Sequence, residues 1–223
     1  MFAGHVGAGL AIGSVDRRVN VGAFITAALL LDFVLWLLVL VGWEAVTIPG
    51  NFSDTHQPAF IFPYSHSLFA GALWSAIAGA AAFLAYARTP SLKWRAALLV
   101  AAAVFSHWLL DALVHQPEMP LAGTGSAMVG LGLWQRMPVA CLVEATIVVA
   151  GLWLFVPGSG LSRGKSIALI AFILVLLAFT VAGMTIAPPP PSALAMAGSS
   201  LVTLVAVCAF AWWLGIRPGG VKD

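Results

Sequence analysis

Three ionisable residues recur at one-turn intervals inside the apolar segment FSHWLLDALVHQPEMPL, residues 105–121. His107, Asp111 and His115 are spaced four residues apart, so a helix places all three on one face. Burying such groups costs several kcal/mol each unless they pair, bind a metal or contact water. A cluster of this kind inside a membrane helix predicts a functional site.

The composition of the chain indicates where these residues lie. Of its 223 residues, 61% are hydrophobic and 8% are charged, about a third of the charged fraction of a soluble domain. We therefore expect an all-α, polytopic helical bundle that forms one transmembrane domain in the lipid bilayer. The net charge of +2 is too small to indicate nucleic acid as a partner.

Hydropathy divides the chain into six expected spans and one shorter helix. Residues 1–14 are apolar but too few to cross a bilayer, which predicts a re-entrant or half-length helix. Gly71, Ser75 and Gly79 form a stripe of small residues that permits close helix packing in lipid. The spans are predicted at residues 21–43, 64–87, 95–116, 137–156, 166–186 and 193–216.

Basic residues fall almost entirely on one side of this arrangement. With six spans, only Arg136 lies on the other side. The positive-inside rule then predicts that both termini are cytoplasmic. The residues on the predicted cytoplasmic side are Arg17, Arg18, Arg88, Lys93, Arg95, Arg163, Lys165, Arg217 and Lys222.

The same topology brings histidines and aspartates from four segments to similar depths in the bilayer. Imidazole and carboxylate ligands suit a divalent metal, zinc first, with manganese or iron as alternatives. A metal held in this way activates a water molecule as a nucleophile. One His–Asp pair alone is more often structural, so the prediction depends on the recurrence of such groups in a very apolar chain. The predicted metal ligands are His5, Asp32, His66, His107 and Asp111.

His115 and Glu144 are the candidates for acid–base chemistry. His115 ends its helix at the interface, where a role as proton shuttle or as the partner of a ligand competes with simple solvation. Glu144 lies deeper, in the fourth span, and fits a metal ligand, a general base, a carboxylate that orients a histidine, or a protonated buried acid. Ser65 and Ser67 flank His66 and are expected to bond the backbone.

Four motifs carry the predicted ligands: GH at Gly4–His5, Asp32 in the first span, HS at His66–Ser67, and SHWLLD at residues 106–111. They resemble the motifs of the bacterial membrane-bound metal-dependent hydrolase family. PYSHSLFAGALW, FSHWLLDALVH, GLGLW and PPPPS resemble an uncharacterised six-span branch of it more closely. This resemblance implies a metal-dependent hydrolase in the bacterial inner (cytoplasmic) membrane. Family members often carry a fuller DxDH-like step where this chain has LLLDFVLW, which implies one ligand fewer.

Two functional hypotheses follow from these residues. The first is a divalent-metal hydrolase whose site opens to the outer face and takes a small-molecule or lipid-like substrate, such as an amphiphilic ester or phosphoester. The second is a proton- or cation-coupled transporter or channel that uses the same His/Asp cluster. Paired polar residues that merely hold helices together are a third interpretation.

Overall fold

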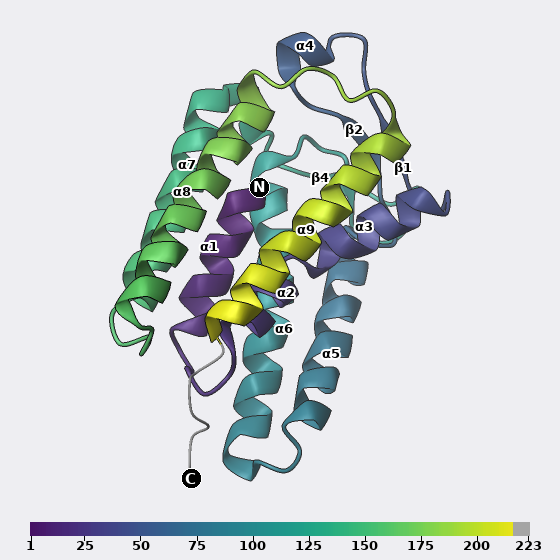
Figure 1. Ribbon diagram of the computed structural model, residues 1–223. Coiled ribbons are helices and arrows are strands. Elements are labelled where there is room, and N and C mark those ends of the chain that lie inside the picture. The colour runs from purple at the N-terminus through teal and green to yellow at the C-terminus, as the bar shows by residue number, and fades with distance from the viewer. Residues whose placement is uncertain (216–223) are drawn as a thin grey trace.

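The computed structural model describes residues 1–215 and consists mainly of α-helices (Figure 1). Within these residues five helices are long and apolar enough to cross a membrane, and a bent pair of shorter helices makes a sixth span if it is counted as one. The prediction of an all-α polytopic membrane bundle is therefore confirmed. The five helices are α5 (Leu68–Ala85), α6 (Pro90–Val114), α7 (Met137–Phe155), α8 (Arg163–Thr185) and α9 (Ala193–Gly215).

A short apolar helix, α1 (Phe2–Gly13), lies inside the bundle, as the half-length helix predicted at the N-terminus requires. It packs against α7 and against α2 (Val21–Ala28). Glycines allow the close approach to α7, because a Cβ atom on Gly7 would lie 2.8 Å from the carbonyl oxygen of Ile147. The approach carries His5 into the centre of the molecule, where it is 1% exposed.

The first span differs from its prediction. Instead of one helix over residues 21–43, the chain forms α2 and α3 (Leu30–Leu40), which meet at an angle of 49°. Neither proline nor glycine marks the break, which falls at the fully buried Leu29. Because a helix end releases backbone carbonyl groups, the break frees the Ala28 oxygen to accept a hydrogen bond from His107 Nδ1 at 2.7 Å. It also places Asp32 in the first turn of α3.

The second span begins later than predicted. Ser67 caps α5 by accepting a hydrogen bond from the Ala70 amide, so His66 lies in the turn before the helix. The predicted stripe of small residues does contact α6 closely: a Cβ on Gly71 would lie 3.3 Å from Trp108, and one on Gly79 would lie 3.1 Å from the Ala97 oxygen. Tight packing of α5 on α6 thereby brings His66 beside the polar face of α6.

Two small β-hairpins lie at one end of the bundle, which we call the hairpin end. Strands β1 (Ala45–Thr47) and β2 (Ala59–Ile61) are antiparallel and enclose the short helix α4 (Phe52–Thr55). Strands β3 (Met119–Pro120) and β4 (Met128–Val129) form the second pair, followed by the 3-10 helix η1 (Leu133–Arg136). These strands lie in the two segments that separate predicted spans, residues 44–63 and 117–136.

The opposite end, which we call the basic end, gathers the loops with Arg17, Arg18 and Arg88 and the start of α8 with Arg163 and Lys165. The side chain of Lys165 donates hydrogen bonds to the last carbonyl groups of α9. Arg136 lies at the hairpin end. The distribution of basic residues therefore follows the predicted topology over the described chain, whereas Arg217 and Lys222 lie outside the described residues.

An ion-pair cluster stabilises the basic end. Asp16 is 5% exposed and accepts hydrogen bonds from Arg18 Nη2 at 2.6 Å and Arg18 Nε at 2.9 Å. Arg95 Nε lies 3.0 Å from the same carboxylate. The hydrogen bonds from Arg18 hold the pKa of Asp16 below its ordinary value of 3.8.

We expect Asp16→Asn to lower the unfolding free energy at pH 7 by about 1 kcal/mol, because both arginines lose a charged partner. A depressed folded-state pKa means that this contribution is complete above about pH 4 and is lost as the pH falls through that pKa. Denaturation in detergent at pH 7 and at pH 3 tests this. The difference between wild type and variant should shrink at the lower pH, and a difference independent of pH would contradict the ion-pair account. Asp54→Asn, at an exposed position in α4, is the matched control.

Candidate metal centre

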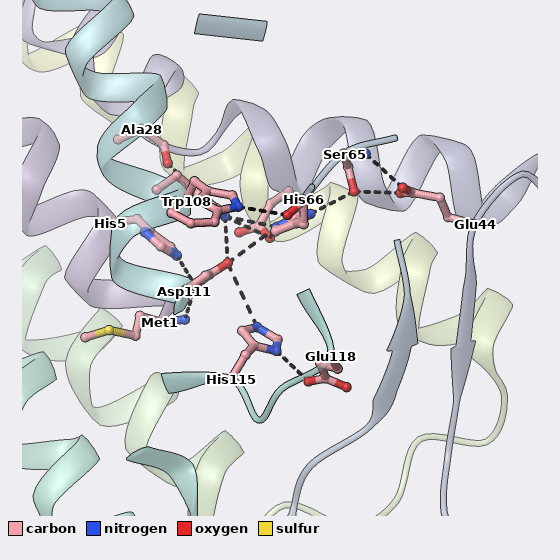
Figure 2. A network of polar contacts seen from close by, with 12 residues as sticks. Met1, His5, Ala28, Glu44, Ser65, His66, Trp108, Asp111, His115 and Glu118 are labelled. Carbon is pink, nitrogen blue, oxygen red and sulfur yellow. Dashed lines mark hydrogen bonds and ion pairs between the residues drawn. The ribbon is translucent and has the colours of Figure 1, made fainter. Parts of the chain in front are cut away.

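Five polar residues from four segments meet between α1, α3, α6 and the turn before α5 (Figure 2). They are the five that sequence predicts as metal ligands: His5, Asp32, His66, His107 and Asp111. Four of them are at most 3% exposed, and the side chain of Asp32 is 20% exposed. The predicted convergence is therefore present, and metal binding itself stays a prediction.

Three ligand atoms form a nearly regular triangle at the centre of this cluster. The distance is 3.2 Å between His66 Nε2 and His107 Nε2. Asp111 Oδ2 lies 3.1 Å from His107 Nε2 and 3.4 Å from His66 Nε2. A tetrahedral zinc ion with ligand bonds of about 2.0–2.1 Å has edges of about 3.3 Å between its ligand atoms. The triangle thus matches one face of a zinc coordination tetrahedron.

Asp32 lies beside this triangle. Its Oδ1 atom lies 3.7 Å from His107 Nε2 and 3.9 Å from His66 Nε2. Both distances exceed a tetrahedral edge of about 3.3 Å, so the side chain of Asp32 would have to move to join an ion held by the triangle. A second combination, His5 with Asp32 and His107, also has its ligand atoms within 4.8 Å of one another.

In His66 and His107, a hydrogen bond at Nδ1 fixes the orientation of the ring and the protonation of Nε2, the nitrogen that belongs to the triangle. The Ala28 carbonyl can only accept a hydrogen bond, so His107 Nδ1 must carry the proton. In a neutral ring, Nε2 is then unprotonated and available as an acceptor or ligand. His66 Nδ1 lies 2.7 Å from Ser65 Oγ, which in turn lies 2.7 Å from Glu44 Oε2. An ionised Glu44 orients this relay so that His66 Nε2 is also unprotonated. Two such nitrogens facing each other at 3.2 Å repel unless a proton or a cation lies between them.

Glu44 follows α3 and is held by three donors. Its Oε1 accepts hydrogen bonds from the amides of Tyr64 and Ser65, each at 2.8 Å, and its Oε2 accepts one from the Ser65 hydroxyl. Burial raises the pKa of Glu44, and these hydrogen bonds oppose that effect. Sequence reasoning missed this partner of His66 and expected Ser65 to bond the backbone. A lone acidic residue just after an apolar span was the available signal.

His115, the predicted acid–base residue, stands at the edge of the cluster. Its Nδ1 lies 2.7 Å from Glu118 Oε1, and its Nε2 lies 3.9 Å from Asp111 Oδ2. Like the two central histidines, it has one ring nitrogen held by an acceptor and the other directed at Asp111 (Figure 2). This arrangement favours the proton-shuttle interpretation over a solvated interfacial histidine, because His115 is only 4% exposed.

The second oxygen of Asp111 connects the cluster to α1. Oδ1 lies 3.1 Å from His5 Nε2 and 3.2 Å from the amino group of Met1. The His5 ring stacks on the His107 ring with their centroids 3.7 Å apart. His5 therefore binds the carboxylate and supports the His107 ring, which makes it a positioning partner as well as a ligand candidate.

Glu144 contacts the start of α1. Its Oε2 accepts a hydrogen bond from the Gly4 amide at 2.5 Å, at the start of α1. Free amide groups and the positive end of the helix dipole favour a carboxylate there. Within the described residues Glu144 lies outside both candidate metal groups and outside the wall of the adjacent cavity. The bond to Gly4 anchors the start of α1, and the catalytic role of Glu144 stays a prediction.

A cavity of about 560 Å³ adjoins the cluster. Asp32, His66, Asp111 and His115 form its polar end, while aromatic and aliphatic side chains form most of the rest. His56 lines the cavity and donates a hydrogen bond from Nδ1 to the Ala187 carbonyl at 3.0 Å. The volume is in the usual range for pockets that take small organic ligands.

Trp108 and Trp74 hold the turn that carries His66. The indole of Trp108 donates a hydrogen bond to the His66 carbonyl, and that of Trp74 donates one to the Tyr64 carbonyl, both at 3.0 Å. These two side chains therefore position the turn and do not line the cavity, whereas Trp134 does.

Fold and site together define a polytopic membrane protein with a buried His/Asp cluster beside a mainly apolar cavity. Comparison with protein-family models, with curated proteins and with solved structures found no match. The resemblance to membrane-bound metal-dependent hydrolases consequently remains an expectation from short motifs. A function has to be inferred from the geometry of the cluster and the cavity.

Proposed function

We propose that this protein is a membrane-embedded, divalent-metal-dependent hydrolase, with zinc as the preferred ion and an ester or phosphoester as substrate. The observation that carries the proposal is the triangle of two imidazole nitrogens and one carboxylate oxygen, with edges of 3.1–3.4 Å, at the polar end of a cavity. Two nitrogen ligands and two carboxylates suit zinc, and they also suit manganese or iron.

The residues of the chain have distinct roles in this proposal. His66, His107 and Asp111, with Asp32, would hold the ion, which would activate a water molecule and polarise the substrate carbonyl or phosphoryl group. His115, with Nδ1 fixed by Glu118, presents Nε2 to the cavity, where it would take a proton from water and return it to the leaving group. Ser65 and Glu44 would keep His66 in the ligating tautomer.

The proposed orientation follows from charge. Basic loops at the end opposite the hairpins favour cytoplasmic termini, which would place the cavity toward the outer face of the membrane. With the motif resemblance, the proposed location is the bacterial inner membrane.

The transporter alternative is less favoured because fully buried apolar side chains lie between the cluster and the basic end. They are Leu10 in α1, Phe24 in α2 and Val104 in α6. A transported ion would need polar groups along that path. Proteoliposome flux that depends on Asp32 and Asp111 would nevertheless favour transport, whereas bound metal without flux would favour the enzyme.

His115→Gln is expected to lower kcat for hydrolysis about 10²–10⁴-fold, the usual contribution of one general acid–base group. Metal content should not change, because His115 is not one of the triangle ligands. The measurement is hydrolysis of p-nitrophenyl esters and phosphoesters by zinc-loaded protein in detergent, alongside elemental analysis. Asp54→Asn, at an exposed position in α4 and outside the cavity wall, is the control and should keep its activity. Loss of metal in His115→Gln would instead make His115 a ligand, and unchanged kcat would remove it from the mechanism.

A further inference from the structure

The cavity extends from the His/Asp cluster to a gap between α8 and α9. These helices follow each other in the chain but pack mainly on different partners: α8 on α7 and α1, and α9 on α2 and α3. Figure 1 shows them well separated toward the hairpin end and closer at the basic end, where Lys165 bonds the end of α9. Both helices contribute to the cavity wall, including Phe179, Gly183 and Met184 from α8 and Met196, Ser199 and Leu204 from α9.

The gap opens on a surface that faces lipid. α8 and α9 are both long and apolar enough to span a membrane, and Phe179 in the cavity wall is 57% exposed. Gly183 and Ser199 are also exposed. The opening therefore lies on the side of the bundle, between two spans, where hydrocarbon chains surround the protein.

Contacts between loops cover the hairpin end of the same cavity. Besides the bond from His56 to Ala187, Gln57 donates a hydrogen bond to the Trp134 carbonyl at 2.9 Å. Gln116 Nε2 donates a hydrogen bond to Gln57 Oε1 at 3.4 Å. These bonds join four segments into a cover over the hairpin end of the cavity: the segment before β2, the loop after α6, η1 and the end of α8. The side opening between α8 and α9 is therefore the less obstructed route for an apolar molecule.

We propose, on the basis of the hydrolase function above, that the substrate is a bilayer amphiphile that enters sideways between α8 and α9. Its head group reaches Asp111 and His115 at the polar end, and its hydrocarbon chain lies along Met184, Met196 and Leu204. The polar and apolar ends of the cavity match the two parts of such a molecule, and the opening is at membrane depth. A water-soluble substrate would use neither the apolar walls nor the side opening.

The test uses full-length protein in lipid nanodiscs that contain a phosphatidylethanolamine with a diazirine at the end of one acyl chain. After irradiation, mass spectrometry should find adducts on Leu35, Thr180 or Leu204, which line the cavity and are at most 6% exposed. Bulk lipid reaches only outward side chains such as Val175 and Val202.

Gly183 lines the cavity at the gap and has no neighbour within 4 Å of its Cβ position. Its helical backbone accepts any side chain, so the ring in Gly183→Phe has room to fill the gap. Labelling inside the cavity should fall about tenfold or more in this variant, since a filled pocket excludes the chain. Gly198→Phe is the matched control, because Gly198 also has no neighbour within 4 Å but lies outside the cavity wall.

Adducts confined to outward side chains, or equal labelling of the cavity in Gly183→Phe and wild type, would overturn the entry route. Metal-stripped wild-type protein separates this result from the proposed chemistry. It should label normally even if hydrolysis is absent, because the chain contacts α8 and α9 and not the ligands. Failure of the hydrolase proposal would therefore leave the labelling intact.

Discussion

Asp111→Ala is expected to abolish metal binding and to destabilise the protein. Asp111 is the residue on which the cluster converges, because Oδ2 forms the triangle with His66 and His107 while Oδ1 binds His5. Loss of a direct ligand should exceed the roughly 10–100-fold loss of affinity that removing an outer partner causes. The variant also leaves the buried His5 ring without its carboxylate partner, and an unsatisfied buried polar group costs about 1–3 kcal/mol.

Asp111→Asn separates the two effects. The amide keeps the shape of the side chain and one oxygen acceptor, so the fold should survive better than in the alanine variant, but the neutral group is a much poorer ligand. Zinc titration and thermal unfolding of both variants, each with and without zinc, give the comparison. Asp54→Ala, at an exposed position in α4, should match wild type in both measurements. Zinc affinity equal to wild type in both Asp111 variants would show that the carboxylate does not bind metal.

Ser65→Ala is the second variant for which we expect a large effect, a decrease of about 10–100-fold in metal affinity without loss of fold. The hydroxyl connects His66 Nδ1 to Glu44 Oε2, both at 2.7 Å. Without it the imidazole is free to place its proton on Nε2, the atom that faces His107 and Asp111. Metal affinity should therefore fall more in Ser65→Ala than in an alanine variant of a serine whose hydroxyl bonds only the backbone of its own helix.

Ser106→Ala is that matched control. Ser106 precedes His107 as Ser65 precedes His66, but its hydroxyl donates to the Ala103 carbonyl of the same helix at 2.7 Å. Competition with a zinc-sensitive dye measures both variants against wild type. Equal affinities in Ser65→Ala and Ser106→Ala would mean that the relay through Glu44 has no influence on the site.

The ligand candidates could be predicted from sequence because charged and imidazole groups are so costly in lipid. In a chain with 8% charged residues, His5, His107 and Asp111 stand out without any structural information. The basic residues in the loops and the lengths of the apolar segments then predict that these residues lie at similar depths in the bilayer. The same reasoning predicted the short buried helix α1, since twelve apolar residues cannot cross a bilayer.

What supports those ligands could not be predicted in the same way. No proline or glycine marks the break at Leu29 in the sequence. The Ala28 carbonyl that it frees accepts a hydrogen bond from His107, a contact between distant parts of the chain. Glu144 looked like a catalytic acid because it is buried, yet burial alone does not distinguish a ligand from a cap on the end of a neighbouring helix. Glu44 depends on a turn whose geometry is set by distant contacts.

The proposed function requires a divalent ion bound by the triangle of His66, His107 and Asp111. The most direct test is elemental analysis of the wild-type protein purified without chelators and loaded with zinc, followed by X-ray absorption spectroscopy at the zinc edge. We predict about one tightly bound ion per chain, with nitrogen and oxygen ligands at about 2.0–2.1 Å, and no such ion in His107→Ala. Protein that stays folded and hydrolytically active without any bound metal would contradict the account.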